Sequence, residues 1–464
     1  MVMDAVLERF AAQCPVAVMA RLGLQRALSA DWVDALFEEH REKQYTRELL
    51  FSTTVDLMSM VAVGLRPSLN AAAQKAGDAL TVSVTALYDK VNHTEPAVTR
   101  ALVAGSATRL APMMTSLRTG TAPWLRGWQI RILDGNHLPA SEKRLKPLRG
   151  FRGAALPGLS LVVYDPDVGM VIDLVPCEDA HAGERPPLAV LLANAKPREL
   201  WLGDRNFCTR PAIRAATAGG AAVLFREHGS HPNATAVGRR HKVGRVETGV
   251  VYEQAVTIPA DEDPTKGVLT LRRIEIKLDE PTEDGDTVIR LLTTLPRSVR
   301  ARAIARLYRK RWTIERVFGR LEAALQSEIR TLAHPRAALL AFALAVVAFN
   351  VLTVIEAAIA ATHDLDAEGL AISTYYVADD VRSTYAGMMI AILAEVWARY
   401  DALSPRALAA TFRQLAARVD PKTLRSHPRG PKIRRVKRYV RRSEAERHVA
   451  TAQVLREGRI PRRP

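Results

Sequence analysis

The sequence predicts an α/β protein in which a mixed-sheet domain with a β-rich insertion follows an α-helical region. Three observations support this fold class: helical periodicity without a credible strand run up to about residue 125, five short β-like runs, and long helical segments after residue 298. A length of 464 residues gives room for about three domains with a substantial core. We expect the helical region at 1–125, the mixed-sheet domain at 126–225 and 296–362, the insertion at 226–295, and a helical C-terminal region with a basic tail at 363–464.

The N-terminal region contains helical segments separated by breaks at Pro15 and Gly77. Residues 81–88 and 95–103 are predicted to form two successive helices, because Thr94-Glu95-Pro96 is a favourable helix start. The pair has the arrangement of a helix-turn-helix, a motif that binds DNA through its second helix. The alternative is that both helices pack in the interior.

The mixed sheet is predicted from the order of its strands and helices. A turn at residues 165–169 joins the second strand to the third, and helices at 188–195 and 210–217 follow the third and fourth. A three-strand meander followed by helix, strand, helix and strand is the order of an RNase H-like domain. The predicted strands are 129–134, 159–164, 170–175, 199–203 and 221–225.

The insertion and the following helices differ sharply in pattern. Residues 226–295 alternate between apolar and polar side chains, which is typical of β-strands. A long amphipathic helix is expected at 298–330 and a nearly all-apolar one at 336–361. We expect the latter to be a buried core helix and not a membrane span, because its unbroken apolar run ends at Asn350 and is shorter than the roughly 20 residues that a bilayer requires.

The charge of the chain indicates a polyanionic partner, most simply nucleic acid. Lys and Arg number 66 against 49 Asp and Glu, a net charge of +17. Residues 421–464 carry 15 Lys and Arg against 3 Glu, which accounts for +12 of that total. We expect this tail to follow DNA phosphates without reading bases, although a merely solvated tail is the alternative. The tail residues singled out are Arg434, Arg435, Lys437 and Arg438.

The cysteines and the N-terminus indicate where the protein resides. The three cysteines form no CxxC pair, so neither a disulfide framework nor a structural zinc site is expected. The first ten residues lack a basic stretch followed by an apolar one, so a secretory signal is not expected. We therefore expect a cytoplasmic protein.

Three acidic residues are candidate ligands for divalent cations. Asp134 and Asp204 each end an apolar strand, where a sheet opens to a crevice, and Glu315 borders the buried stripe of the long helix. Carboxylate oxygens suit Mg²⁺ or Mn²⁺, and two such ions about 4 Å apart can activate the attacking oxygen and stabilise the leaving one in phosphoryl transfer. The alternatives are turn residues at the strand ends and a solvated pair between Arg311 and Glu315.

The segments around these acids resemble the signature motifs of the insertion-sequence-four group of DDE transposases. They are Ile132-Leu-Asp134-Gly, Gly203-Asp204-Arg205-Asn-Phe207 and Tyr308-x2-Arg311-x3-Glu315. The likeness covers about residues 128–350, including segments 156–165 and 177–185. It implies an RNase H-like catalytic domain whose metal-binding triad is Asp134, Asp204 and Glu315.

The same resemblance implies how DNA is held. Arg205, Tyr308 and Arg311 would hold the DNA end, and members of the group act as synapsed dimers. The family's Lys seven positions after the Glu is replaced here by Glu322, so Arg316 or Arg320 would supply the cation. Relatives stack a flipped base on a Trp of the insertion; no Trp lies between 226 and 295, and Tyr252 is the nearest aromatic candidate.

We therefore expect a bacterial, nucleoid-associated DNA transposase that uses two Mg²⁺ ions, with Mn²⁺ as a possible substitute. Its partners would be double-stranded DNA, as element terminal inverted repeats and as target, and a second copy of the chain, with no membrane. The helical N-terminal region would recognise the terminal repeats. Two alternatives stay open: an RNase H-like nuclease that cuts without joining, and an inert DNA-binding protein descended from a transposase.

Overall fold

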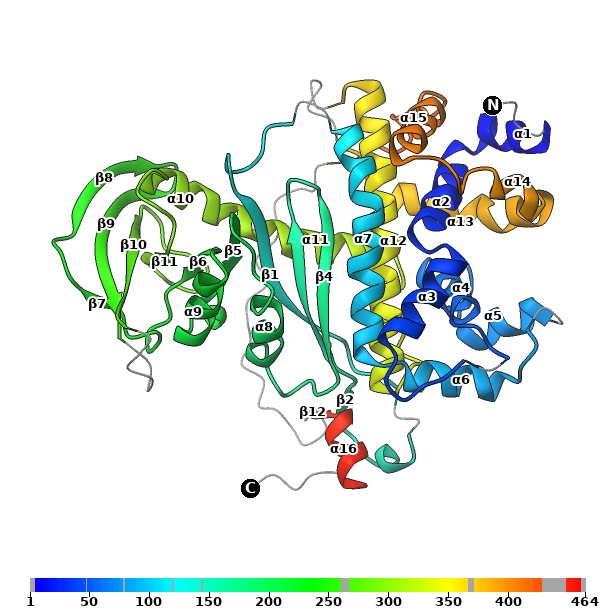
Figure 1. Cartoon of the computed structure of the whole chain (residues 1–464), viewed down its shortest axis with the longest axis horizontal. Helices are drawn as coiled ribbons and strands as arrows, with labels where there is room; N and C mark the ends of the chain where they lie inside the picture. Colours follow the sequence, from blue (N-terminus) through cyan, green and yellow to red (C-terminus); the bar gives the residue numbers. More distant parts are fainter. Residues whose placement is uncertain are drawn as a thin grey trace.

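The computed structural model describes residues 5–46, 48–77, 80–118, 121–142, 145–259, 267–365, 371–427 and 448–459. One long mixed sheet lies beside a bundle of helices to which both the N-terminal and the C-terminal parts of the chain contribute (Figure 1). The predicted α/β fold class, with helices preceding a mixed sheet, is confirmed.

The N-terminal helices begin where capping residues occur. Ser68 and Ser83 each accept a hydrogen bond from the backbone N–H three residues later, which satisfies a donor that the first helical turn leaves unpaired. The helices are α1 (Ala5–Gln13), α2 (Pro15–Ala27), α3 (Ala30–His40), α4 (Phe51–Ala62), α5 (Leu69–Ala76), α6 (Val84–His93) and α7 (Pro96–Leu117).

The two helices considered for a helix-turn-helix are α6 and α7. Helix α7 continues far beyond the predicted end at residue 103, and it packs along strand β4 and helix α12. Val98, Leu102, Val103 and Leu110 on it are completely buried. A recognition helix must be exposed to reach a DNA groove. The structure therefore favours the alternative of interior packing for this segment.

The central strands have the predicted RNase H-like order. The sheet runs β4-β3-β1-β5-β6; β1 is antiparallel to β3 and parallel to β5, and β5 is parallel to β6. The strands are β1 (Gln129–His137), β3 (Leu159–Asp165), β4 (Met170–Cys177), β5 (Glu199–Gly203) and β6 (Ala222–Arg226), with α8 (Arg185–Leu192) and α9 (Arg210–Ala218) between them.

The insertion extends this same sheet. Strand β11 pairs antiparallel with β6, β10 with β11, and β9 with β10, so the added strands and the five central strands form one ten-stranded sheet whose far edge is the left side of Figure 1. The added strands are β7 (Thr235–Ala236), β8 (His241–Val246), β9 (Gly249–Ile258), β10 (Leu269–Leu278) and β11 (Val288–Thr293).

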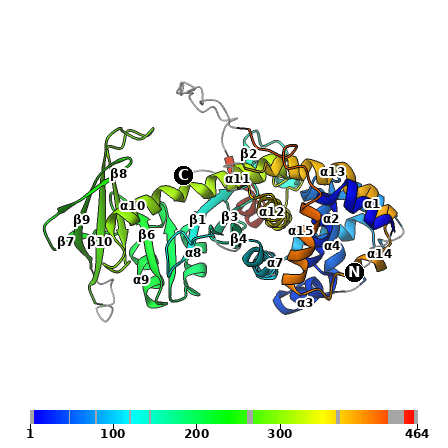
Figure 2. The ribbon, with the colours of Figure 1, turned by 90° about the horizontal axis from the view of Figure 1, so that it is seen from above.

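Two apolar cores lie on the two faces of the central sheet. Helices α8 and α9 cover one face, where Leu133 and Trp201 pack with Leu188 and Ile213. Helices α10 and α11 cross the other face (Figure 2). There Ile132 belongs to the large core that continues into the helical bundle. Because side chains alternate along a strand, Asp134 shares the face of Ile132, the α11 face.

The long helix expected at 298–330 is interrupted and ends early. It consists of α10 (Ala301–Arg309), a 3₁₀ turn (Lys310–Trp312) and α11 (Thr313–Ala324). Leu325 has an extended backbone, and the N–H of Gln326 donates to the carbonyl oxygen of Ala62 in α4. Tertiary contact with the N-terminal helices therefore ends the helix before the periodicity does.

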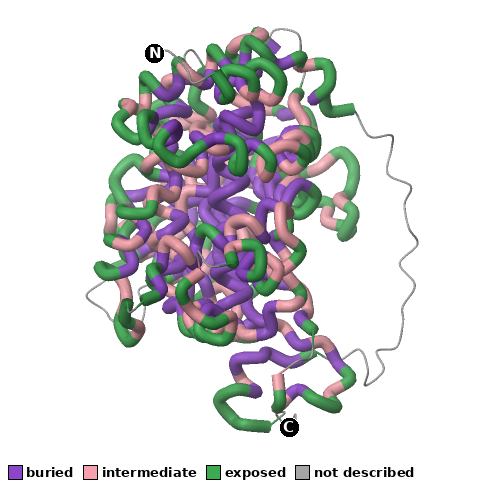
Figure 3. Tube along the Cα trace, turned by 90° about the vertical axis from the view of Figure 1, so that its right-hand side faces the viewer, coloured by how far each residue is buried: buried purple, intermediate pink, exposed green. Residues whose placement is uncertain are grey.

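Helix α12 (Pro335–His363) is the buried core helix. In the described part of the chain it alone is long and apolar enough to cross a membrane, but its most apolar stretch is entirely buried. Buried residues, purple in Figure 3, fill the interior of the molecule. The completely buried side chain of Asn350 bonds the edge strand β4: its Nδ2 donates to the carbonyl oxygen of Val171 at 2.7 Å, and its Oδ1 accepts from the Val171 N–H at 3.0 Å. Asn350, which interrupts the apolar run, thus satisfies two backbone groups at the edge of the sheet.

The C-terminal helices return to the bundle. Helix α13 packs on α2 and α11, and α15 packs on α12 and α7. Farther along, β12 pairs in parallel with β2 (Ala154–Leu156). These elements are α13 (Thr374–Ala391), α14 (Ala394–Ala398), α15 (Pro405–Ala416), β12 (His448–Ala450) and α16 (Thr451–Glu457).

Candidate active site

Asp134 lies within strand β1 and not at its end, which corrects the sequence-based expectation. The strand continues to His137 because residues 132–137 pair with β3. On its other side, the parallel ladder with β5 ends at the pair Ile132–Leu202. Asp134 therefore lies two residues past the end of the parallel pairing.

Asp204 follows β5 directly and caps a short 3₁₀ turn (Arg205–Phe207). Its Oδ1 accepts a hydrogen bond from the N–H of Asn206 at 2.7 Å. Asp204 is therefore the turn residue that was considered as an alternative. It lies directly after the last residue of β5, beyond the last pair of the β1–β5 ladder.

Glu315 lies in the first turn of α11 and shares a buried guanidinium with Asp134. Arg311 Nη2 lies 3.2 Å from Glu315 Oε1, and Arg311 Nη1 lies 3.9 Å from Asp134 Oδ2. The Arg311 side chain is 9% exposed, whereas that of Glu315 is 42% exposed. The interaction expected between Arg311 and Glu315 is present, and it extends to a carboxylate on a different element.

The environment of Asp134 disfavours its negative charge. Burial raises the pKa of Asp134 to about 7; Arg311 opposes this, and the carboxylates of Glu184, Glu315 and Asp204 add to it. Asp134 therefore lies within electrostatic range of the other two predicted acids, Asp204 and Glu315, and of a fourth acid, Glu184. A carboxyl group that titrates near neutrality among like charges is typical of catalytic and cation-binding sites.

Tyr308 is a buried residue of the same cluster and is hydrogen-bonded to Arg311. It is 6% exposed, and burial raises its pKa to about 12, with the hydrogen-bonded Arg311 acting in the opposite direction and Asp204 adding to the rise. Tyr308 therefore stays a neutral hydroxyl beside Arg311.

Two residues of the site were assigned no role from the sequence. Glu184, at the N-terminal end of α8, accepts a hydrogen bond at its Oε2 from Asn206 Nδ2 at 2.5 Å. Both residues lie in segments that carried the family resemblance, and this was the only available signal. Their proximity depends on how α8 packs beside β1 and β5, which the sequence does not reveal.

The residues predicted to bind DNA fall into different surroundings. Arg205 and Arg316 are exposed, and each directly follows one of the acids in the sequence. Arg320 is directed to the helical bundle, where its Nη2 lies 2.5 Å from Glu356 Oε2 and its Nε donates to Thr374 Oγ1. Tyr252 lies on β9 beneath the guanidinium of Arg240, 3.8 Å from the ring centre. The tail residues Arg434, Arg435, Lys437 and Arg438 lie outside the described residues.

Glu322 is exposed near the end of α11, on the part of the helix that faces Glu328. Burial raises the pKa of Glu328, and the neighbouring Glu322 adds to the rise. The position that carries a Lys in the family is thus locally acidic in this chain.

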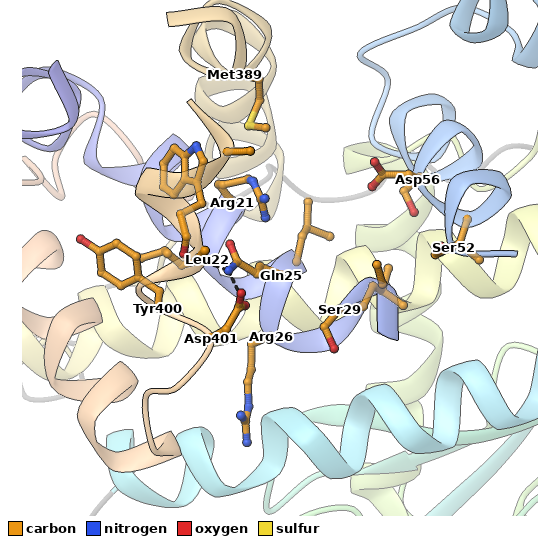
Figure 4. A pocket seen from close by; sticks show the side chains of 18 of the residues that line it. Arg21, Leu22, Gln25, Arg26, Ser29, Ser52, Asp56, Met389, Tyr400 and Asp401 are labelled. Atoms are coloured by element: carbon orange, nitrogen blue, oxygen red, sulfur yellow. Dashed lines mark hydrogen bonds between the residues drawn. The ribbon is translucent and has the colours of Figure 1, made fainter. Parts of the chain in front are cut away.

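A separate cavity lies in the helical bundle, between α2, α4 and the α13–α14 segment (Figure 4). Arg21, Asp56 and Tyr400 line it, and Gln25 Nε2 donates to Asp401 Oδ1 at 2.5 Å across it. None of the three predicted acids lines this cavity. It is therefore not part of the candidate active site.

The donor set of the acid cluster fits hard divalent cations. Its ligands are carboxylate oxygens, which Mg²⁺ and Mn²⁺ prefer. Among the residues that the structure describes, no three acidic, histidine or cysteine side chains are arranged to hold an ion as they stand. Two of the acids, Asp134 and Glu315, contact the guanidinium of Arg311 instead.

Comparison with known proteins identifies the domain that carries these acids. Residues 127–351 match the family model described as the transposase DDE domain. No curated protein matches the chain. The match includes β1, the turn after β5, and α11, and so all three predicted acids. This part of the chain is therefore similar to a transposase DDE domain, and the similarity supports a DDE-type transposase.

Proposed function

We propose that this protein is a transposase of the insertion-sequence-four group that cleaves DNA at the ends of its element and joins the freed 3′-hydroxyl to target DNA. The observation that carries the proposal is that Asp134, Asp204 and Glu315 come from three separate elements to one cluster: Arg311 contacts Asp134 and Glu315, and the charge of Asp204 acts on Asp134. Acids that served only as turn residues or as a solvent-exposed ion pair on a helix would not need to interact with acids from other elements.

Two Mg²⁺ ions, or Mn²⁺ in their place, would be held by Asp134, Asp204 and Glu315. When bound, such ions activate the attacking oxygen and stabilise the charge of the leaving one. A bound cation would compete with Arg311 for the carboxylates of Asp134 and Glu315. Arg311 would contact a DNA phosphate, which is the role proposed for it from the family motif.

The reaction needs no nucleotide cofactor, because each step exchanges one phosphorus–oxygen bond for another. In the first step, the oxygen of water attacks the phosphorus at the element end, and the 3′-oxygen leaves and takes up a proton. In the second, this 3′-hydroxyl attacks a target phosphodiester and loses its proton, while the target's own 3′-oxygen leaves.

The remaining partners follow from charge. Arg205 and Arg316 are exposed cations close to the acids in the chain and are proposed DNA contacts. The basic tail would follow phosphates, Tyr252 would stack on a base, and two copies of the chain would synapse a pair of ends in the bacterial cytoplasm.

The test uses paired DNA ends, taken from inverted repeats that flank the gene, with a supercoiled target. We expect the wild-type protein with Mg²⁺ to yield joined products. Asp134→Ala, Asp204→Ala and Glu315→Ala should each abolish cleavage while DNA binding survives, and Arg311→Ala should weaken end binding in a gel-shift titration. Cleavage without joined products would instead indicate a nuclease, and binding without cleavage an inert DNA-binding protein.

A further inference from the structure

Glu184 contacts both of the segments that carry the strand acids. Its Oε2 accepts from Asn206 Nδ2 at 2.5 Å, and the backbone N–H of the same Asn206 donates to Asp204 Oδ1 at 2.7 Å. Its Oε1 lies against Gly135, the residue after Asp134: a Cβ built on Gly135 would lie 1.8 Å from that oxygen. The carboxylate thus fills the space that any side chain at position 135 would need.

This contact lies where the sheet no longer holds the two acids together. The β1–β5 ladder ends at Ile132–Leu202, so no backbone hydrogen bond of that ladder joins the segment of Asp134 to the turn of Asp204. Glu184 spans the gap from the α8 side, with one oxygen on each segment. The hydrogen bond from Asn206 holds Glu184 to the turn of Asp204, and the close contact with Gly135 holds it to the segment of Asp134, so the two contacts together can fix a spacing that the ladder leaves open.

We propose that Glu184 is a positioning residue that sets the separation of Asp134 and Asp204 by bridging Gly135 and Asn206. The inference rests on the proposed function, in which these two acids hold divalent cations. Residues that orient metal ligands typically change metal affinity 10- to 100-fold when they are removed. The bridge also explains the glycine at position 135. Glycine is required there because Glu184 approaches the backbone closely, and not because the backbone angles are unusual.

The test measures Mn²⁺ binding to the full chain by the electron paramagnetic resonance signal of free Mn²⁺, without DNA. Glu184→Ala and Asn206→Ala should each weaken binding about tenfold or more, and the double variant should be no weaker than either single variant, because both remove one bridge. Glu184→Gln should bind within about threefold of wild type, since its amide oxygen still accepts from Asn206. Gly135→Ala should weaken binding as Glu184→Ala does, and Glu280→Ala, at an exposed acid elsewhere, should not.

Two results would overturn the proposal. Wild-type affinity in Glu184→Ala would show that the bridge has no effect on the acids. Equal loss in Glu184→Gln and Glu184→Ala, with Asn206→Ala unaffected, would show that the charge of Glu184 acts directly.

A separate readout keeps this inference distinct from the proposed function. If wild type and Asp134→Ala bind Mn²⁺ equally poorly, the proposed function fails. Amide hydrogen exchange of residues 204–207 then tests the bridge alone. The bridge predicts faster exchange in Glu184→Ala but not in Glu184→Gln, and unchanged exchange in both variants would contradict it.

Discussion

Asp134→Asn is expected to stabilise the cation-free protein in a pH-dependent manner. The substitution keeps the size of the side chain and the acceptor that bonds the N–H of Gly135 at 3.1 Å, while it removes the charge. The pKa of Asp134 is raised from its ordinary value of 3.8 to about 7, chiefly by burial. The folded state thus disfavours ionisation of Asp134. The resulting loss in the free energy of unfolding is absent below about pH 3.8, grows as the pH rises to about 7, and is constant above that pH.

The size of the effect follows from these two values. At about 1.4 kcal/mol per pKa unit, the ionised carboxylate costs at most about 4 kcal/mol at pH 8 and less than about 2 kcal/mol at pH 5. Urea unfolding in EDTA should therefore show a gain in the free energy of unfolding for Asp134→Asn that is larger at pH 8 than at pH 5. Asp89→Asn, at an exposed carboxylate, is the matched control. A gain that does not grow with pH, or a loss at pH 8, would refute the reasoning.

Four further substitutions test other parts of the structure. Arg311→Ala should raise the pKa of Asp134 further, because Arg311 opposes the rise, and so move the pH midpoint of Mn²⁺ affinity upward; an unchanged midpoint would contradict this. Asn350→Leu should cost about 2 to 4 kcal/mol in urea unfolding, because two backbone groups of the edge of β4 lose their partner, and a cost below about 1 kcal/mol would argue against that role. Arg320→Ala should lower thermal stability with little change in DNA affinity, whereas Arg316→Ala should do the reverse; the opposite pattern in a gel shift would restore Arg320 as a DNA contact.

Features that depend on local pattern were predictable from the sequence. The order of the central strands and helices along the chain follows from short β-like runs and the turns between them, and the burial of α12 follows from an apolar run too short to span a bilayer. The acids came from motif spacing, and the structure brings Asp134 and Glu315 to the same guanidinium. Their catalytic roles stay predictions.

Features that depend on tertiary contacts were not predictable. Strand β1 continues past Asp134 because β3 pairs with it, and α11 ends early because Gln326 bonds to α4. The motif suggested Arg320 as a cation in place of the family's Lys, but helix α12 supplies Glu356 as its partner. Glu184 joined the site for the same reason, since only the packing of α8 carries it to Gly135.

Iron-directed cleavage of the polypeptide tests most directly whether three distant segments form one cation centre. Fe²⁺ substituted for Mg²⁺, with ascorbate and peroxide, generates radicals that cut the nearby backbone. We predict fragments that end close to residues 134, 204 and 315, which excess Mg²⁺ suppresses and Asp134→Ala removes. Cuts confined to one of these segments, or persisting unchanged in Asp134→Ala, would contradict a shared centre.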